Sequence, residues 1–297
     1  MIRSFFRLGF VAASSVVALL FLAEPSAASA ATYDVDITAD APNRNQCTAA
    51  PGDCSLRGAI DKATTTPGTH TINVPNGTYT LSSVSGDLIV SKSMTIRGAG
   101  GTVIIQAATS PGVATNRVLR VASGTLTLAN VEIRHGASVD GAGIHIQAGA
   151  ALVGTRVLVQ ANQALGGGLG VNSTGGGIRT LGSLTLRRSA IVSNGARIGG
   201  GLAVESGGSA SLFNTTVSNN YREWGDDASG INVRPGGSAS LDGVTVYQNH
   251  ALALAGQGES GIHAGGQVTI KNSIVAFNDN PLGIVNCYGN IVSLGNN

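Results

Sequence analysis

The feature that most constrains the fold is a unit that recurs along the chain from residue 126 to residue 275. Each unit carries an apolar residue and, five positions later, a second one. The first set is Leu128, Leu152, Leu186, Leu212, Leu241 and Ile270. The second set is Ile133, Val157, Ile191, Val217, Val246 and Val275. Successive first residues lie 24 to 34 positions apart, a spacing typical of repeat architectures.

Two further elements keep the same phase in the repeat. A glycine-led segment precedes each unit, and its equivalent apolar positions are Ile144, Ile178, Leu202, Ile231 and Ile262. In four consecutive units an asparagine follows the second apolar residue by three positions: Asn194, Asn220, Asn249 and Asn278. Asparagines stacked at one corner can hydrogen-bond amide to amide, and they tolerate the left-handed backbone that a tight corner needs.

These patterns predict an all-β chain that forms a parallel β-helix. The apolar residues come in short clusters rich in β-branched residues and separated by Gly or Asn, which is typical of strands and not of helices. A sandwich or barrel would also contain short strands, but would not repeat one residue type at one phase. Coils stacked at about 4.8 Å can bury their inner faces only against one another.

A stack of coils has two ends, and the N-terminal one is expected to be covered by a helix. The strand-like pattern extends back to His70, where we expect the solenoid to begin. In the preceding "DCSLRGAIDKA", one helical face would be apolar, and Asp53 or Ser55 would cap the helix N-terminus. The residues on that face are Leu56, Ala59, Ile60 and Ala63. Such a helix would shield the exposed coil edge from pairing with another chain.

The first 30 residues have the composition of a cleaved secretory signal peptide. Arg3 and Arg7 precede an apolar run, and Ala28-Ser29-Ala30 provides small residues at its exit. The alternative is a single membrane anchor, although the apolar run is short for a spanning helix of about 20 residues. Removing residues 1–30 leaves 16 Lys and Arg against 15 Asp and Glu, so no nucleic-acid or anionic-membrane binding is expected.

Export favours a disulfide between Cys47 and Cys54, because thiols outside the cytosol are commonly oxidised. These cysteines bracket the turn-forming segment "TAAPGD". A zinc site is the alternative, but no second pair of Cys or His ligands lies nearby in the sequence. Cys287 is left over, and we expect it to be free or paired between chains.

The stretch "CTAAPGDCSLRGAI" resembles the CSLREA domain, which is named for a motif at the start of exported bacterial proteins. "YDVDITAD", at residues 33–40, looks like the strand that precedes this motif, and the remainder resembles the right-handed parallel β-helix repeats that follow it. The resemblance implies a signal peptide at 1–30, a stapled cap at 31–69 and the β-helix at 70–297. Gly58 departs from the motif's Glu and is a poor helix former, at a cost of about 1 kcal/mol relative to Ala. The chain also ends soon after Cys287, where relatives run on, so a truncated final coil is expected.

The densest acidic cluster is "REWGDDASG", which contains Glu223, Asp226 and Asp227 beside the one tryptophan, Trp224. Paired carboxylates near an aromatic ring suit a glycoside hydrolase, and the Asp pair with "GIHAGG" loosely resembles elements of polygalacturonases. Other elements of that family are missing. The two GIH histidines, at 145 and 263, are therefore interpreted as coil residues, and "REWGDD" as a polar loop.

Three functional hypotheses follow. The first is an exported, non-catalytic β-helix protein, secreted or at the cell surface, that contacts extracellular polysaccharide or host glycans. The second is a polysaccharide-active enzyme, a glycoside hydrolase or a lyase, that uses Asp226 and Asp227. The third is a damaged copy without function. No cofactor or metal is expected, and the basic residues do not form a row with an acidic cluster at the same phase of the repeat. These are Arg187, Arg188, Arg222, Arg234 and Lys271.

Overall fold

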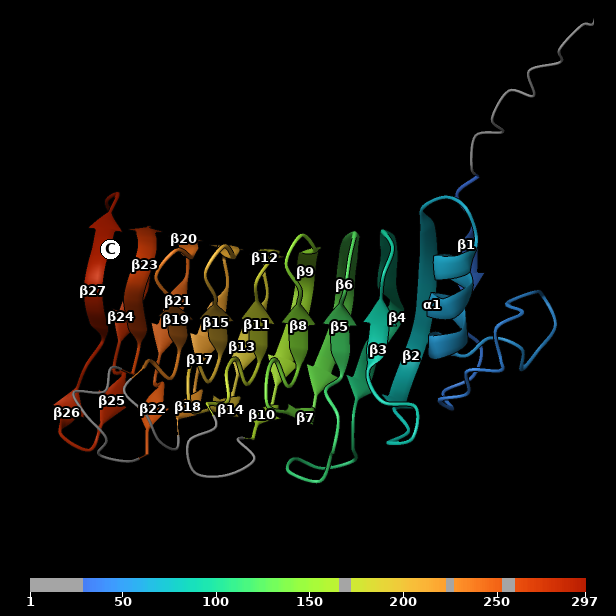
Figure 1. Ribbon diagram of the computed structural model, residues 1–297, viewed down its shortest axis with the longest axis horizontal. Helices are drawn as coiled ribbons and strands as arrows, with labels where there is room; N and C mark the ends of the chain where they lie inside the picture. Colours follow the sequence, from blue (N-terminus) through green and yellow to red (C-terminus); the bar gives the residue numbers. More distant parts are fainter. Residues whose placement is uncertain (1–28, 166–171, 223–226, 253–259) are drawn as a thin grey trace, which may run out of the picture.

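The chain winds into a parallel β-solenoid of about seven turns, with its coils side by side from α1 at one end to β27 at the other (Figure 1). This computed structural model describes residues 29–165, 172–222, 227–252 and 260–297. Strands of successive coils pair in parallel, so the expected parallel β-helix is confirmed. The signal peptide expected at residues 1–30 lies almost wholly outside the described residues.

The strands form four columns that run along the solenoid, and two of these carry most of the core. Column one contains β3 (Leu88–Val90), β5 (Leu119–Val121), β8 (Ile144–Ile146), β11 (Ile178–Thr180), β15 (Leu202–Val204), β19 (Ile231–Val233) and the first parts of β23 (Ile262–Lys271) and β27 (Cys287–Ser293). Column two contains β1 (Thr32–Asp34), β2 (His70–Thr80), β4 (Met94–Gln106), β6 (Thr125–Arg134), β9 (Ala151–Gln160), β12 (Ser183–Arg187), β16 (Ser209–Phe213), β20 (Ser238–Asp242) and the second parts of β23 and β27.

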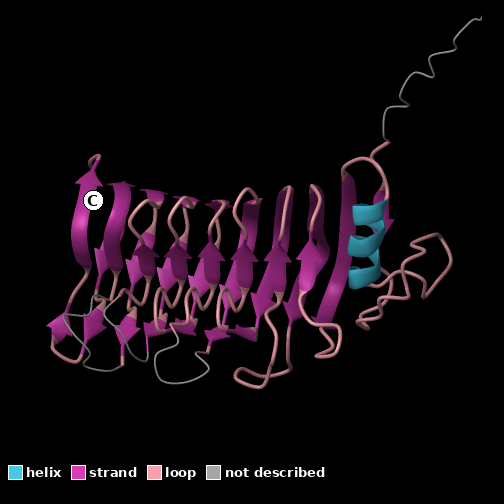
Figure 2. Ribbon diagram, viewed as in Figure 1, coloured by secondary structure: helices cyan, strands magenta, loops and turns pink. Residues whose placement is uncertain are grey.

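Columns three and four close each coil. Column three contains the second parts of β2, β4, β6 and β9, followed by β13 (Ala190–Val192), β17 (Thr216–Ser218), β21 (Thr245–Tyr247) and β24 (Ile274–Ala276). Column four contains β7 (Ala137–Ser138), β10 (Gln163–Ala164), β14 (Gly195–Ala196), β18 (Tyr221–Arg222), β22 (His250–Ala251), β25 (Asp279–Asn280) and the antiparallel β26 (Gly283–Ile284). Figure 2 shows how loops join these columns around the coils.

The core is a set of apolar rows that run through the coils. In column one the row Ile144, Ile178, Leu202, Ile231 and Ile262 is fully buried and in register, as the sequence predicts. In columns two and three the rows through Leu212 and Val217 are also in register and buried. Strands that alternate inward and outward side chains produce this arrangement.

The predicted register is wrong for one unit. Leu152 pairs with Leu184 and not with Leu186, whose partner is Gly154. Val159, and not Val157, pairs with Ile191. A Cβ on Gly154 would lie 2.5 Å from Cδ2 of Leu186, so the neighbouring leucine fills the space that a side chain would need. The sequence pattern placed an apolar residue at this row, whereas packing requires none there.

A ladder of buried asparagine amides runs along the corner between columns three and four. Each Nδ2 group donates to the Oδ1 atom of the next asparagine at 2.8–3.1 Å, and each ladder backbone N–H donates to that same oxygen. Each Nδ2 also donates to a backbone carbonyl one coil back. The members are Asn162, Asn194, Asn220, Asn249, Asn278 and Asn286. The ladder therefore extends the predicted row by one residue at each end.

The left-handed backbone at this corner belongs to the residue before each ladder asparagine. These residues are Ala161, Ser193, Asn219, Gln248 and Phe277, with φ between 50° and 57°. The expectation that the ladder asparagines themselves adopt the left-handed conformation is wrong. Their shared chemical role in the coils is to satisfy buried backbone groups through the amide.

We predict that Asn220→Ala lowers the free energy of unfolding by about 2–4 kcal/mol, because it leaves the backbone N–H and Nδ2 of Asn194 without an acceptor inside the stack. Urea denaturation followed by circular dichroism measures the change. Asn43→Ala, on an exposed loop, is the control and should change stability by under about 0.5 kcal/mol. Equal effects of the two substitutions would contradict a structural role for the ladder.

The first coil is covered by helix α1 (Leu56–Thr65), which lies against β2 and β3. Ser55 is the N-cap, and its hydroxyl accepts from the Gly58 N–H at 3.0 Å. The carboxylate of Asp53 instead accepts from Thr48. The predicted apolar face is buried, and Arg57 is buried with it.

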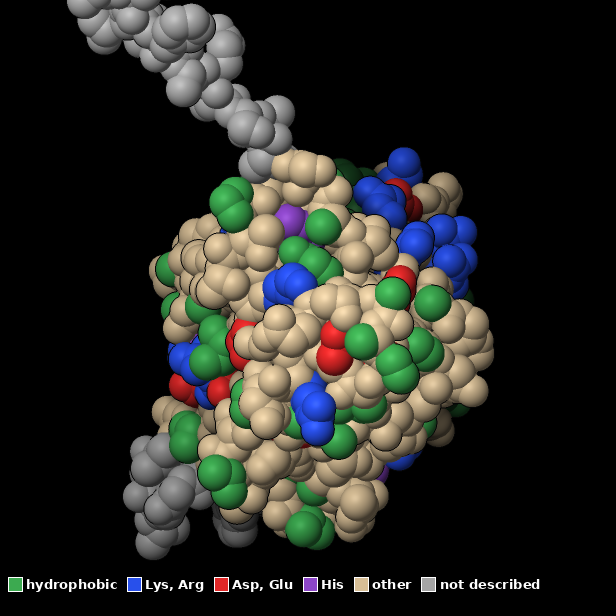
Figure 3. Space-filling model, turned by 90° about the vertical axis from the view of Figure 1, so that its right-hand side faces the viewer, with side chains coloured by type: hydrophobic (Ala, Val, Ile, Leu, Met, Phe, Trp, Pro, Cys, Tyr) green, Lys and Arg blue, Asp and Glu red, His purple; other side chains and the backbone are tan. Residues whose placement is uncertain are grey.

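Arg57 fixes this helix to the loop after β1 and to the turn before β3. The guanidinium of Arg57 forms a double hydrogen bond with Asp40 at 2.7 and 2.9 Å, and it also donates to the carbonyls of Gly86 and Asp87. Cys47 and Cys54 form the predicted disulfide just before the helix. Seen end-on from the side of α1, hydrophobic side chains are scattered among polar ones, so this end does not expose the apolar cross-section of the stack (Figure 3).

Gly58 is required by close packing. The sequence alone indicated only a poor helix former that costs stability at this position. A Cβ at this position would lie 2.0 Å from the carbonyl oxygen of Arg44, and that carbonyl accepts from the Ser55 N–H. The glycine therefore lets α1 approach the preceding loop closely. Its low helix propensity is offset by this contact.

We predict that Gly58→Ala destabilises the protein by about 1–3 kcal/mol, the range of overpacked sites. Helix propensity alone predicts the opposite sign, a gain of about 1 kcal/mol. Thermal denaturation decides between the two. Thr64→Ala, on the partly exposed side of α1, is the control and should be neutral or slightly stabilising. A rise in Tm for Gly58→Ala would refute the packing argument.

Candidate functional site

Column one presents one side chain per coil to the outer face of the solenoid. The middle residue of each short strand points to this face, while its neighbours pack into the core. The aligned middle residues are Ile89, Arg120, His145, Arg179, Ala203, Asn232, His263 and Tyr288. We call this row, together with the flanking charged residues that pair with it or with one another, the outer stripe; the flanking residues are Asp87, Arg117, Asp140, Glu205, Asp227 and Arg234. Adjacent residues of the row lie one coil apart, about 4.8 Å.

Carboxylates from the flanking loops pair with the arginines of the outer stripe. At the α1 side, Arg120 Nε lies 3.0 Å from Asp87 Oδ2, and Arg117 lies 3.6 Å from the same oxygen. Arg117 comes from the segment just before β5 and also donates to Ser138 at 2.8 Å. This part of the face therefore has two cations and one acid, in contact.

The ion pairs continue along the middle of the outer stripe. Arg179 lies 3.2 Å from Asp140 and 2.9 Å from Glu205. Glu205 also lies 3.4 Å from Arg234. The four groups form one chain, Asp140–Arg179–Glu205–Arg234, in which acid and cation alternate from coil to coil.

Near the β27 end of the outer stripe lies the candidate residue Asp227. Its carboxylate lies 3.8 Å from Arg234 and 3.7 Å from Nδ1 of His263, and its side chain is 26% exposed. The ring of His263 lies 5.5 Å from that of Tyr288, which is 56% exposed. The other residues of the predicted acidic cluster, Glu223, Trp224 and Asp226, lie outside the described residues.

The alignment of cations with acids is a correction to the sequence prediction. Arg234 belongs to the outer stripe, whereas Arg222 is buried in column four and Arg187, Arg188 and Lys271 lie on other faces. The acids that pair with Arg179 are 26 and 39 residues away in the sequence. Only the stacking of the coils brings these acids to Arg179, and no local sequence motif predicts the pairing. His145 and His263 are coil residues, as expected, and they also face the site.

His145 is held in its neutral form. Burial, together with the positive charges of Arg117 and Arg179, lowers the pKa of its imidazole to about 4. Its Nδ1 atom has no hydrogen-bond partner among the described residues. The ring therefore offers an uncharged polar group between two arginines.

We predict that His145 makes stability depend on pH between about 6.5 and 4. The unfolded chain binds a proton in this range and the folded one does not, so stability falls as the pH falls. The loss should be about 1–2 kcal/mol after allowance for solvent screening. His145→Ala should flatten the pH dependence of the free energy of unfolding, and Ala203 shows that alanine fits this row. An unchanged pH profile would contradict the assignment.

Asn232 is the least explained residue of the outer stripe. Its side chain is 1% exposed, and neither its Oδ1 nor its Nδ2 has a hydrogen-bond partner in the described part of the chain. A buried amide without any partner is uncommon and costs free energy. A water molecule or a polar ligand group at this place would satisfy it.

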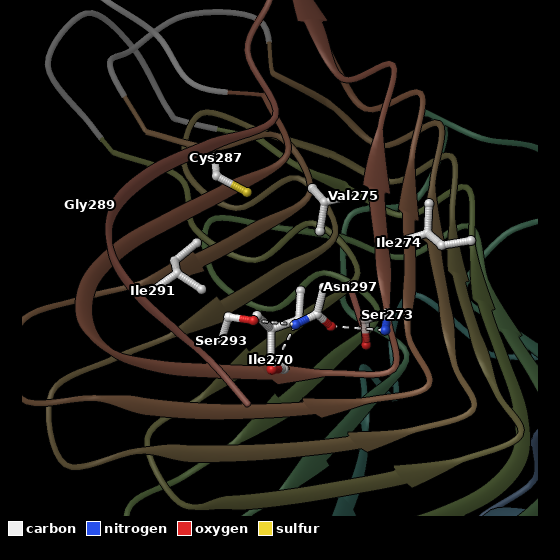
Figure 4. Close-up of a pocket in the computed structure, with 9 residues that line it drawn as sticks. All are labelled: Ile270, Ser273, Ile274, Val275, Cys287, Gly289, Ile291, Ser293 and Asn297. Carbon is white, nitrogen blue, oxygen red and sulfur yellow. Dashed lines mark hydrogen bonds between the residues drawn. The ribbon is translucent and has the colours of Figure 1, made fainter. Parts of the chain in front are cut away.

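A second candidate is a cavity of about 420 Å³ at the end of the last coil (Figure 4). Val275, Cys287 and Ile291 point into it, and Asn297 hydrogen-bonds to Ser293 and Ser273 at its edge. No charged side chain lines this cavity. Cys287 is free, and burial raises the pKa of its thiol above the ordinary value, so the reactive thiolate is disfavoured at neutral pH. The cavity lacks the groups that acid–base chemistry requires.

Within the described residues, no three His, Cys, Asp or Glu side chains are grouped so that they could hold a metal ion. That same part of the chain includes no helix with the length and hydrophobicity needed to cross a membrane.

Comparison with known proteins gives one structural likeness. No protein-family model matches the chain, and a search of curated proteins finds no similar sequence. Among solved structures, the crystal structure of pectate lyase Pel9A is similar, with a TM-score of 0.46 and 19% sequence identity. The likeness covers 89% of this chain and 61% of that one.

Proposed function

We propose that this chain is an exported, non-catalytic β-helix protein that contacts an extended polysaccharide along the outer stripe. The observation that supports this is a row of outward positions, one per coil, on a single face of a rigid stack, with polar side chains at all of them except Ile89 and Ala203. A polymer of similar sugar units can meet such a row repeatedly. Each contact can be weak because the contacts add along the chain.

The chemistry of the row suits sugar hydroxyl groups, which both donate and accept hydrogen bonds. The outer stripe contains arginine donors, carboxylate acceptors and the neutral His145. Its four arginines and four carboxylates balance in charge, so neutral or weakly charged sugars are favoured. The rings of His263 and Tyr288 supply an apolar surface for the face of a sugar ring.

A catalytic role receives less support from the same geometry. The stripe's cations are arginines, which remain protonated in proteins and therefore do not act as bases. Lys62, Lys92 and Lys271 all lie elsewhere: in α1, in the turn between β3 and β4, and at the end of β23. The described carboxylates are shared with arginine partners. The enzymatic alternative depends on Asp227 and its undescribed neighbours, and the experiment below tests it.

Export and a surface location are part of this proposal. The Cys47–Cys54 disulfide is compatible with an oxidising compartment. Arg57, which belongs to the CSLREA-like motif, fixes the capping helix through part-buried hydrogen bonds to Asp40. We accordingly propose a signal peptide at 1–30, a CSLREA-like cap at 31–69 and the binding solenoid at 70–297.

We predict that residues 31–297 bind at least one glycan on an array, and that His263→Ala and Tyr288→Ala each weaken binding about five- to tenfold, roughly 1–1.4 kcal/mol. Isothermal titration with the glycan identified on the array measures the affinity. Thr185→Ala, on the outer face of column two, should leave it unchanged.

The same samples are screened for cleavage of neutral and uronate polymers. Absence of glycan binding would overturn the proposal. Cleavage that is lost in Asp227→Asn would establish the enzymatic alternative instead.

A further inference from the structure

A different surface lies at the corner between columns two and three. One residue per coil adopts a left-handed backbone there, with φ between 47° and 67°. These residues are Asn130, Arg156, Arg188, Asn214, Gly243 and Asn272. Asn and Gly tolerate this conformation, whereas an arginine in it is strained. Two neighbouring coils therefore carry arginine where the rest of the row carries the expected residues.

These two arginines lie side by side and are exposed. Thr155 in β9 pairs with Arg187 in β12, so the residues that follow, Arg156 and Arg188, are one coil apart at about 4.8 Å. The side chain of Arg188 has no hydrogen bond or ion pair with any described residue, and among the described residues the side chain of Arg156 donates only to Oδ1 of Asn130. The guanidinium of Arg187 stacks on the Phe213 ring at 4.1 Å. None of the three arginines has a carboxylate partner in the described part of the chain.

The surface beside them is hollowed. Two shallow depressions of about 220 and 350 Å³ adjoin and share Arg156 and Leu158. Glu132 lines the first depression, where Arg134 at 3.1 Å and Gln160 at 2.7 Å already occupy its carboxylate. The second depression lies between Arg156 and Arg188 and has no acidic residue in its lining.

We propose that Arg156, Arg187 and Arg188 form an anion site that binds the carboxylate or sulfate groups of an acidic polysaccharide. The planar guanidinium matches these oxyanions and holds them through paired hydrogen bonds. Uncompensated charge on adjacent coils suits an acidic polymer, in contrast to the balanced outer stripe.

The test replaces both corner arginines by the residue that the neighbouring coils use. Arg156→Asn/Arg188→Asn should fold with an unchanged or higher Tm, because asparagine tolerates the left-handed backbone. It should bind polygalacturonate and dextran sulfate at least about tenfold more weakly than the wild type and lose most of the salt dependence of that binding. Neutral dextran is the probe without oxyanions and should bind neither protein at this corner.

Arg44→Asn is the matched control, since it removes an exposed arginine from the N-terminal loop. Unchanged binding of both acidic polymers by the double variant would overturn the anion site. An equal loss of affinity in Arg44→Asn would also overturn it, because the binding would then depend on net charge alone. Loss for only one polymer supports the site and assigns its oxyanion. The outer stripe is left intact in the double variant, so failure here is distinguishable from failure of the proposed function, which His263→Ala and Tyr288→Ala test.

Discussion

Backbone hydrogen bonding between coils is the interaction on which the rest of this structure depends. The backbone hydrogen bonds of the strands join one coil to the next. The N–H of Ile178 donates to the carbonyl of Gly201 in the next coil, and the N–H of Leu202 donates to the carbonyl of Gly230 in the coil after it. Every inward side chain therefore meets the residue at the same phase one coil away. The asparagine ladder follows from this geometry, because an amide fixed in one coil finds the next amide at hydrogen-bonding distance.

The same dependence makes the two ends different from the middle. At the N-terminal end, α1 replaces the missing coil, and close packing at Gly58 with buried hydrogen bonds from Arg57 holds it in place. At the other end, β27 pairs only with β23, and large apolar side chains are exposed around it. These include Phe277, Leu282, Ile284, Val292 and Leu294. The residues that shield an end of the stack are therefore different from those that form its core.

Periodic features could be predicted from the sequence, and features that depend on contacts between distant loops could not. The inward rows and the central asparagines repeat at a fixed phase, so the pattern alone identifies them. Gly154 breaks the apolar pattern because Leu186 fills its space, which shifted the predicted register by two residues. In the correct register Asn162 follows Val159 by three positions and joins the ladder. The outer stripe was missed since its acids lie on loops of variable length.

The core and the surface of a solenoid are subject to different constraints, and this difference determines where such a chain can acquire binding residues. Inward positions must match their neighbours in size, so they vary little from coil to coil. Outward positions are equally well aligned but need not match, so a row can hold alternating charges in one column and uncompensated arginines at another corner. Because the alignment is supplied by the backbone, each substitution on the outside adds one group to an ordered row. A repeated polymer is the kind of ligand for which such a row gives more than the sum of isolated contacts.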